Sequence, residues 1–223
     1  MNVAPAILVS AIAFAAGCGM GSSPGMAPSA ASPGQFTGTE NPISENGAWR
    51  HNGLDWTVVA KTNGFAHGTQ TGNGGFDDSY AYLSGFPANQ SASATIALNT
   101  SATDANTREV ELLLRWSDSA HSATGYEINL HYLGAYVQIV RWNGAFGDFT
   151  QVGGVTNLPK PKTGDVMTAT IVGNVITVFY NGTQIAQASD STYATGNPGM
   201  GFFIRAPAAN TDFGFSGFTA TGL

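Results

Sequence analysis

The chain has 223 residues, a formal net charge of −6 and 10% charged residues, against about 25% in an average globular protein. This acidic balance excludes nucleic acid as a partner, because nucleic acid is bound through a basic surface. The 29 glycines, with abundant Thr, Ser and Asn, predict many turns and polar, uncharged sheet faces. Cys18 is the single cysteine, so the fold cannot depend on an internal disulfide and has to rest on its hydrophobic core.

Residues 1–18 have the features of a signal peptide. An apolar run over residues 3–16 is about 14 residues long, which is too short for a bilayer span and fits the core of an export signal. It ends in Ala15-Ala16-Gly17-Cys18, similar to a bacterial lipobox, although Ala15 replaces the usual Leu and no Lys or Arg precedes the run. We expect lipidation of Cys18 and an exported protein anchored in the cell envelope. A cleaved signal of a secreted protein and a structural role for the segment are the alternatives.

Residues 19–35 are rich in Gly, Pro and Ser and contain no charged or aromatic side chain. This composition cannot bury enough apolar surface to become ordered, which predicts a flexible linker. The remaining residues, 36–223, suffice for one β-sandwich domain with its own core. We expect a monomer that reaches the membrane only through its lipid anchor.

Short alternating or β-branched runs, separated by Gly, Asn and Asp, follow one another through residues 36–223. In Val166–Ala188 three such runs are joined by tight turns, and Asn181-Gly182 suits a two-residue type I′ turn. In the last run, Gly217 predicts a bulge that returns Phe218 to the face of Phe213 and Phe215. About thirteen strands and no helix beyond the signal are expected. The principal strands are Leu54–Ala60, Tyr80–Ser84, Ser93–Leu98, Arg108–Trp116, Gly125–Tyr132, Ala135–Trp142, Phe149–Val152, three within Val166–Ala188, Gly199–Arg205 and Asp212–Thr221.

Two central runs carry the densest polar pattern. Helix competes for Arg108–Trp116, since Glu and Leu are good helix formers, but the strict alternation favours a strand there and in Gly125–Tyr132. One face would be core, with Val110, Leu112, Leu114, Trp116, Tyr126, Ile128, Leu130 and Tyr132. The opposite face would project Glu109, Glu111, Arg115, Glu127, Asn129 and His131 together.

The pattern T-A-T-I-V-G-N-V-I-T-V-F-Y-N-G-T-Q-I from Thr168, followed by G-N-P-G-M-G-F-F-I and D-F-G-F-S-G-F-T-A-T, resembles the concanavalin A-like lectin/glucanase superfamily. Laminin G-like and 3-keto-disaccharide-hydrolase-like domains of exported bacterial proteins share this pattern, and the resemblance covers residues 36–223. It implies an all-β, two-sheet antiparallel jelly-roll sandwich whose concave sheet binds or cleaves glycans, with a structural calcium in many members. The shared features belong to turns and core, so they specify the fold better than the activity.

We therefore expect extracytoplasmic binding of a polysaccharide or other glycan by the polar face. The candidate binding residues are Glu109, Glu111, Arg115, Glu127, Asn129, His131, Gln138 and Trp142. Trp142 would offer an indole on which a sugar ring stacks. The alternative is a solvated sheet face with weak cross-strand Glu–Arg pairs, which would leave a structural cell-envelope domain.

A polysaccharide lyase or glycoside hydrolase on the same face is the other candidate function. Its candidate catalytic residues are His131, Tyr136, Arg115, Glu111 and Glu127. In a lyase, Arg and Asn would neutralise a uronate carboxylate, His131 would remove the C5 proton and Tyr136 would protonate the leaving oxygen. The runs at 108–112, 129–131 and 134–138 are similar to jelly-roll alginate-lyase motifs, with one extra residue in the first and Asn for Gln in the second. A glycosidase would use paired carboxylates, although the family's three-acid strand motif lacks its middle Asp and last Glu here.

Metal ligands are few. The four histidines lack zinc-ligand spacing, so a zinc site is not expected. Asp77-Asp78, beside a glycine-rich stretch, and Asp212, before the last strand, could supply oxygens to a structural Ca²⁺. The alternative is that these aspartates only form turns. No other cofactor is predicted.

Overall fold

The computed structural model describes residues 35–72, 75, 77–99, 108–132, 136–205 and 208–223. The predicted signal with Cys18 and the linker up to residue 34 lie outside these residues. Phe36 is fully buried. Within the described ranges, no helix is long and apolar enough to cross a bilayer, and the helical structure consists of one 3₁₀ turn, η1 (Asn210–Asp212).

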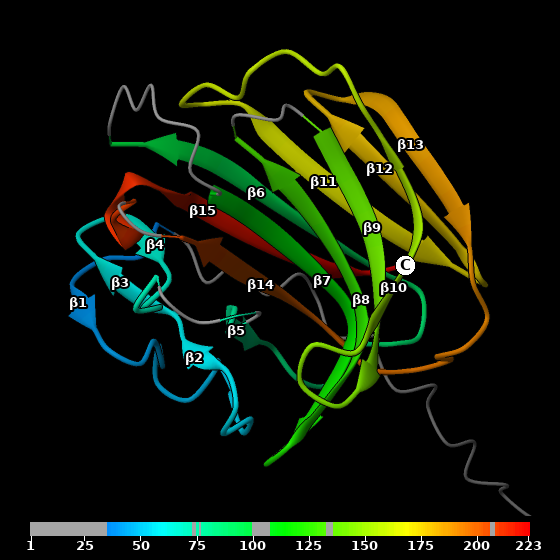
Figure 1. The fold of residues 1–223 in the computed structure, drawn as a ribbon, viewed down its shortest axis with the longest axis horizontal. Coiled ribbons are helices and arrows are strands. Elements are labelled where there is room, and N and C mark those ends of the chain that lie inside the picture. Colours follow the sequence, from blue (N-terminus) through cyan, green and yellow to red (C-terminus); the bar gives the residue numbers. More distant parts are fainter. Residues whose placement is uncertain (1–34, 73–74, 76, 100–107, 133–135, 206–207) are drawn as a thin grey trace, which may run out of the picture.

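Two stacked sheets form a sandwich, which confirms the predicted all-β jelly roll (Figure 1). The larger sheet has the order β1 (Thr39–Glu40), β3 (Ala60–Thr62), β4 (Phe65–His67), β15 (Phe213–Gly222), β6 (Gln90–Leu98), β11 (Val166–Val172), β12 (Val175–Tyr180) and β13 (Thr183–Ser189). The smaller sheet has the order β10 (Phe149–Val155), β9 (Tyr136–Gly144), β8 (Ser122–His131), β7 (Arg108–Ser119), β14 (Asn197–Ile204), β5 (Ser79–Tyr82) and β2 (Thr57–Val58). The described residues thus contain fifteen strands, slightly more than expected.

The meander β11–β12–β13 forms as its sequence predicts. Asn181 and Gly182 have φ values of 50° and 78°, which is the left-handed conformation that a type I′ turn requires at both central positions. Along β11, Met167, Ala169 and Ile171 are fully buried, because alternate side chains of a strand point to the same face. The turn and the alternation together fix the register of this part of the larger sheet.

The closing strand β15 contains the predicted bulge. Its pairing with β6 slips between Phe215 and Gly217. Phe213, Phe215 and Phe218 are all buried, with at most 3% of each side chain exposed. The extra residue therefore restores Phe218 to the core, as expected from a bulge.

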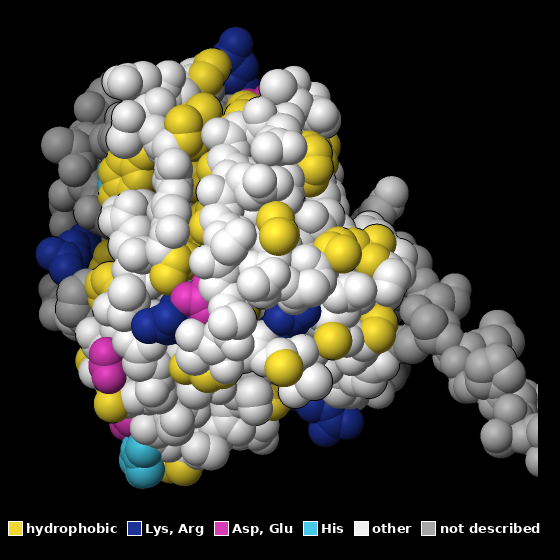
Figure 2. Space-filling model, turned by 90° about the vertical axis from the view of Figure 1, so that its right-hand side faces the viewer, with side chains coloured by type: hydrophobic (Ala, Val, Ile, Leu, Met, Phe, Trp, Pro, Cys, Tyr) yellow, Lys and Arg dark blue, Asp and Glu magenta, His cyan; other side chains and the backbone are white. Residues whose placement is uncertain are grey.

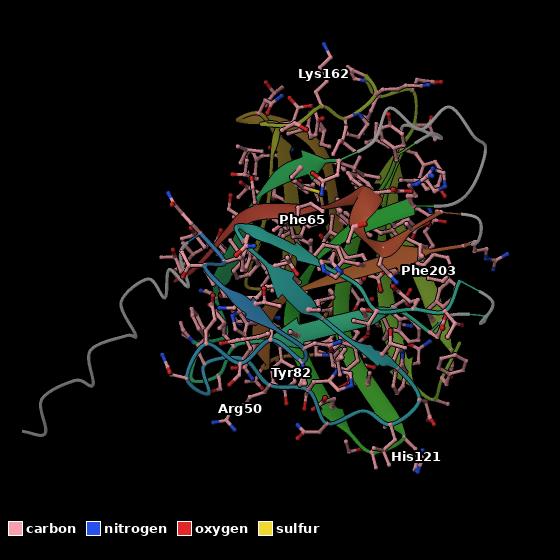
Figure 3. All side chains as sticks on the ribbon, turned by 90° about the vertical axis from the view of Figure 1, so that its left-hand side faces the viewer. Arg50, Phe65, Tyr82, His121, Lys162 and Phe203 are labelled. Atoms are coloured by element: carbon pink, nitrogen blue, oxygen red, sulfur yellow. The ribbon has the colours of Figure 1, made fainter. Side chains whose placement is uncertain are left out.

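The expected strand Leu54–Ala60 is wrong as a single element. Its residues divide between β2 in the smaller sheet and β3 in the larger one, with a crossing between them at Val59. Strand β2 pairs in parallel with β5, against the antiparallel rule of the other pairs. Just before β2, Arg50 lies beside Tyr82 in an isolated bridge (Figure 3). The residues before β2 therefore run along the smaller sheet rather than forming an ordinary hairpin.

The core lies between the sheets, and a second apolar cluster lies on the outer face of the smaller sheet. Leu112, Leu114 and Ile139 belong to the core, whereas their strand neighbours Leu113 and Val140 belong to the second cluster. The full outer cluster comprises Trp56, Tyr80, Tyr82, Leu113, Trp116, Ala123, Val140 and Trp142. Because alternate residues face opposite ways, the smaller sheet is buried on both faces over much of its area. The polar face predicted for it is therefore only partly open to solvent.

A bulge in β7 changes which face its last residues occupy. Arg115 has φ 49°, an uncommon left-handed value for this residue type, and the β7–β8 register slips between Leu114 and Ser117. The slip places Trp116 in the outer cluster and not in the core with Leu112 and Leu114. The prediction that Trp116 shares their face is wrong, because strict alternation cannot reveal a bulge.

Candidate functional site

A pocket of about 270 Å³ opens on the outer face of the smaller sheet. Its volume is close to the roughly 300 Å³ at which small-molecule sites begin. Strands β7, β8, β9 and β14 supply most of its walls, so the pocket stands on hydrogen-bonded scaffold rather than on loops. The lining residues are Asp78, Glu109, Glu127, Asn129, Tyr136, Gln138, Val140, Trp142, Phe149, Phe203 and Arg205.

The register of the central strands brings the predicted polar residues into rows. Glu109 lies opposite His131, which lies opposite Tyr136 on β9. In the next row Asn129 lies between Glu111 and Gln138. Glu127 follows one row further along β8, between Leu113 and Val140. Cross-strand neighbours on one face have Cβ atoms about 4.5–5.5 Å apart, so these residues form one continuous surface, as the alternation predicts.

Glu127 is the best-held acid of the pocket. Its Oε2 accepts a 2.6 Å hydrogen bond from Trp142 Nε1, and its Oε1 accepts a 3.1 Å bond from Asn129 Nδ2. Asn129 Oδ1 in turn accepts a hydrogen bond from the Gln138 backbone N–H. Trp142, expected as an exposed stacking platform, is 2% exposed and holds Glu127 while it lines the pocket. The indole therefore combines a structural contact with a position at the site.

Three carboxylates, of Glu109, Glu111 and Glu127, form what we call the acid trio. Each contributes an oxygen, and these oxygens all lie within 4.8 Å of one another. Glu111 is 1% exposed, and its Oε1 has no hydrogen-bond partner in the part of the chain that the structure describes. A side chain at Gly201 on β14 would place its Cβ 2.1 Å from Glu111 Oε2, so only glycine leaves room there for the carboxylate. The described residues thus contain an acidic group that could bind a metal ion.

Burial and mutual repulsion shift the acids of the pocket in one direction. Burial, followed by the charge of Glu127, raises the pKa of Glu109 to about 8. The pKa of Glu111 is raised well above its ordinary value by burial and then by Glu127, Asp78 and Glu109. Burial also raises the pKa of Glu127, against the hydrogen bonds from Trp142 and Asn129 that lower it. Desolvation disfavours the charged form of each acid, so the trio favours any bound proton or cation.

Aromatic and basic residues complete the pocket at its rim. Phe149 is 39% exposed, and its ring centroid lies 5.6 Å from that of Trp142. Phe203 lies at the end of β14 (Figure 3), and the Arg205 guanidinium lies over its ring, 5.6 Å from the ring centroid. Arg205 is exposed, and its positive charge partly offsets the rise that burial and Glu127 cause in the pKa of Glu109. Sequence reasoning missed these three residues, because they come from strand ends outside the two runs with the dense polar pattern.

Arg115 does not belong to this site, which corrects the expectation that it shares the face of Glu109 and Glu111. Its guanidinium donates to three backbone carbonyls, those of Ala88, Tyr193 and Gly173, at 2.6–2.8 Å. The β7 bulge turns the side chain toward the loops at the end of the sandwich. Arg115 therefore ties segments together there and cannot serve the sugar-binding or catalytic role predicted for it.

His131 and Tyr136 do converge. Their rings stack with centroids 4.7 Å apart and an interplanar angle of 13°. Burial lowers the pKa of His131, which favours the neutral imidazole that a general base needs. Burial and then the charge of Glu109 raise the pKa of Tyr136. Tyr136 lines the pocket, and His131 lies beside it on β8.

The predicted calcium ligands do not gather in one place. Asp212 Oδ2 forms an ion pair with Arg108 at 3.1 Å and accepts the Ala209 N–H at 3.0 Å. Asp78 instead lines the pocket, where burial and then Glu127 and Glu109 raise its pKa. Among the described residues, Asp77, Asp78 and Asp212 do not form a group of three whose side chains could hold one ion together. The acidic residues that fit a cation are the acid trio, which the sequence pattern placed on one face without assigning them to a metal.

Comparison with solved structures finds the same two-sheet jelly-roll fold in proteins of low sequence identity. The carbohydrate binding module CBM66 from Bacillus subtilis superposes with a TM-score of 0.55 at 14% identity, over 78% of this chain and 92% of that one. The Ca²⁺-bound exoplasmic/lumenal domain of VIP36 has a TM-score of 0.58 at 9% identity, over 85% and 88%. The GH43 protein BlXynB from Bacillus licheniformis has a TM-score of 0.52 at 14% identity, over 85% of this chain and 39% of that one. No protein-family model and no curated protein matches the chain.

Proposed function

We propose that the protein is an extracytoplasmic carbohydrate-binding domain and that the pocket on its smaller sheet holds one or two sugar residues of a glycan. The observation that carries this proposal is the combination of hydrogen-bonding groups and aromatic rings in one preformed cavity. Glu127, Asn129 and Gln138 offer acceptors and donors to sugar hydroxyls, while the exposed Phe149 offers a ring to the apolar face of a sugar. Pockets with a few convergent polar groups among apolar walls are typical ligand sites.

The mostly uncharged surface and the solved structures of similar fold also support carbohydrate binding. The face shown in Figure 2, which is the right-hand side of Figure 1, is covered mostly by uncharged side chains, in keeping with the 10% of charged residues in the chain. Among the similar structures, one is named as a carbohydrate binding module and another was crystallised with Man3GlcNAc. We extend carbohydrate binding to this chain on the strength of its own pocket. Export through the predicted signal and anchoring through Cys18 are part of the proposal.

A pair of phenylalanines provides a matched test. Phe149 and Phe146 are similarly exposed, at 39% and 41%, and each packs on a tryptophan, Trp142 and Trp56 respectively, at 5.6 Å. Only Phe149 lines the pocket. The protein should be tested on a broad panel of glycans by affinity gels, followed by calorimetry on the ligands found. We expect Phe149→Ala to weaken binding about tenfold, equivalent to about 1.4 kcal/mol, and Phe146→Ala to leave it unchanged. The absence of binding across the panel, or equal effects of both substitutions, contradicts the proposal.

Glycoside hydrolysis on the same pocket is the second candidate function. The oxygens of the acid trio lie within 4.8 Å of one another, close to the roughly 5–5.5 Å between the two carboxyl groups of retaining enzymes. The pKa of Glu109, raised to about 8, would keep a proton available at neutral pH for the leaving oxygen. The lyase alternative receives less support, because Arg115 lies away from His131 and Tyr136.

Activity can be separated from binding with the same glycan panel. Reducing ends report hydrolysis, and the absorbance of unsaturated products reports lyase cleavage. If the protein is a hydrolase, Glu127→Gln should abolish the release of reducing ends while glycan still binds. Retained binding without any product from the unmodified protein would leave the carbohydrate-binding function alone.

A further inference from the structure

The acid trio differs from an ordinary acidic patch because one of its members, Glu111, is buried with one of its carboxyl oxygens unpaired among the described residues. Glu111 is 1% exposed, and its Oε1 has no hydrogen-bond partner within the described residues. A buried polar atom without a partner loses its hydration and gains nothing in return, which costs about 1–3 kcal/mol, and more for a charged group. The chain nevertheless has a carboxyl group here, against Gly201, where a smaller apolar residue would pack without that penalty.

We propose that Glu109, Glu111 and Glu127 hold a divalent cation, of which Ca²⁺ fits best, beneath the carbohydrate pocket. Some point lies no more than about 2.8 Å from all three oxygens, since oxygens within 4.8 Å of one another fit in a sphere of radius 4.8/√3 Å. Ca²⁺ binds oxygens at about 2.3–2.6 Å, so movements of a few tenths of an ångström complete the contacts. Mg²⁺ demands about 2.0–2.1 Å and near-octahedral ligands, which three acids on neighbouring strands supply less readily.

The surroundings favour the ion in two further ways. Glu127 is already oriented by Trp142 and Asn129 through its two oxygens, so it loses little freedom when it becomes a ligand. Glu109 and Glu127 line the pocket whereas Glu111 lies beneath it. An ion among them would therefore keep coordination positions on the pocket side for water or for hydroxyl groups. Ca²⁺ takes six to eight oxygen ligands, more than three carboxylates supply if each gives one oxygen.

The site can be tested without any sugar, so its outcome is independent of the proposed carbohydrate binding. The full chain is first treated with chelator, and calcium chloride is then titrated in by calorimetry. We expect one ion per chain, saturation below about 1 mM, a rise in melting temperature and weaker binding of magnesium chloride. Terbium(III) serves as a second probe, because Trp142 contacts Glu127 directly and excitation of the indole should sensitise terbium emission that calcium then displaces.

Matched variants decide whether the trio is the site. Glu111→Gln preserves shape and should weaken calcium binding at least tenfold and remove the sensitised terbium emission. Asp148→Asn changes the charge equally at an exposed position outside the pocket and should leave both signals intact. Glu109→Gln, at a more open position, should reduce binding even if Glu111→Gln proves hard to purify. The proposal is overturned if calcium does not saturate the unmodified protein, if magnesium binds as tightly, or if neither trio variant weakens binding.

Discussion

Two acids on the same face of the smaller sheet, Asp118 and Glu111, differ in the hydrogen bonds that their carboxyl groups accept. Asp118, near the end of β7, accepts four hydrogen bonds of 2.6–2.8 Å, two from Asn52 and one each from Tyr80 and Tyr82. Glu111, on the same strand, has one oxygen, Oε1, that accepts no hydrogen bond from any described residue. The donors lower the pKa of Asp118 against the effect of burial, whereas the pKa of Glu111 is raised. A fully satisfied acid acts as a structural element, and an unsatisfied one indicates a site for a ligand.

The largest expected effect is the loss of the satisfied acid. Asp118→Ala would leave the hydroxyls of Tyr80 and Tyr82 without their acceptor in the outer cluster and would release the segment at Asn52. Hydrogen bonds to charged groups contribute about 1.5–3 kcal/mol each, and the effects of one network are not additive. We expect the free energy of unfolding to fall by about 3 kcal/mol, measured by urea denaturation, and Asp118→Asn to recover part of it. An unchanged free energy of unfolding would show that Asp118 has no structural role.

Gly201 provides the next test, because the absence of a side chain at this position leaves room for the buried Glu111 carboxyl group. In Gly201→Ala the new Cβ would meet Glu111 Oε2 at 2.1 Å, and overpacking of this kind costs about 1–3 kcal/mol. In a Glu111→Ala background the clash is removed, so the same change should cost much less, and a double-mutant cycle measures the difference. Gly75→Ala, which meets no atom within 4 Å, is the control. Equal penalties in both backgrounds would show that Glu111 does not occupy this space.

The unsatisfied acid should respond in the opposite way to Asp118. In chelated protein, Glu111→Gln replaces a carboxyl group whose Oε1 has no hydrogen-bond donor among the described residues, and burying an unpaired charge costs free energy that a neutral amide of the same shape does not. We expect the free energy of unfolding to remain within about 1 kcal/mol of that of the unmodified protein, or to rise. A loss as large as that of Asp118→Ala would show that Glu111 is structurally required and would erase the contrast between the two acids.

The smallest expected effect is the pH dependence of stability in chelated protein, which should differ in sign between Glu109 and Asp118. The pKa of Glu109 is raised from an ordinary 4.5 to about 8, so the folded state binds more protons between these values and stability should fall as pH rises through that window. The lowered pKa of Asp118 has the opposite sign, because its contribution is present above the ordinary value of 3.8 and is lost as pH falls through the folded pKa. Urea midpoints recorded across pH should show both slopes. Glu109→Gln should reduce the upper slope, to which the raised pKa values of Glu111 and Glu127 also contribute, and Asp118→Asn should reduce the lower one.

Much of the fold follows from signals that act between neighbouring residues of the sequence. Asn181-Gly182 fixes a turn through its own backbone freedom, and Gly217 marks the bulge that returns Phe218 to the core. Period-two alternation placed Glu109, Glu111 and Glu127 on one face before any pairing was known. Such features depend on a few neighbouring residues and on the geometry of a pleated strand.

Tertiary structure decided which polar residues make the site and what they lack. The left-handed backbone of Arg115 sent that side chain to three carbonyls away from the pocket, while Phe149, Phe203 and Arg205 entered from strand ends that no alternation connects to it. The room for the Glu111 carboxyl group depends on the packing of β14 against β7 at Gly201. Hydrogen-bond satisfaction and desolvation are sums over groups distant in sequence, so they exist only once the strands have paired.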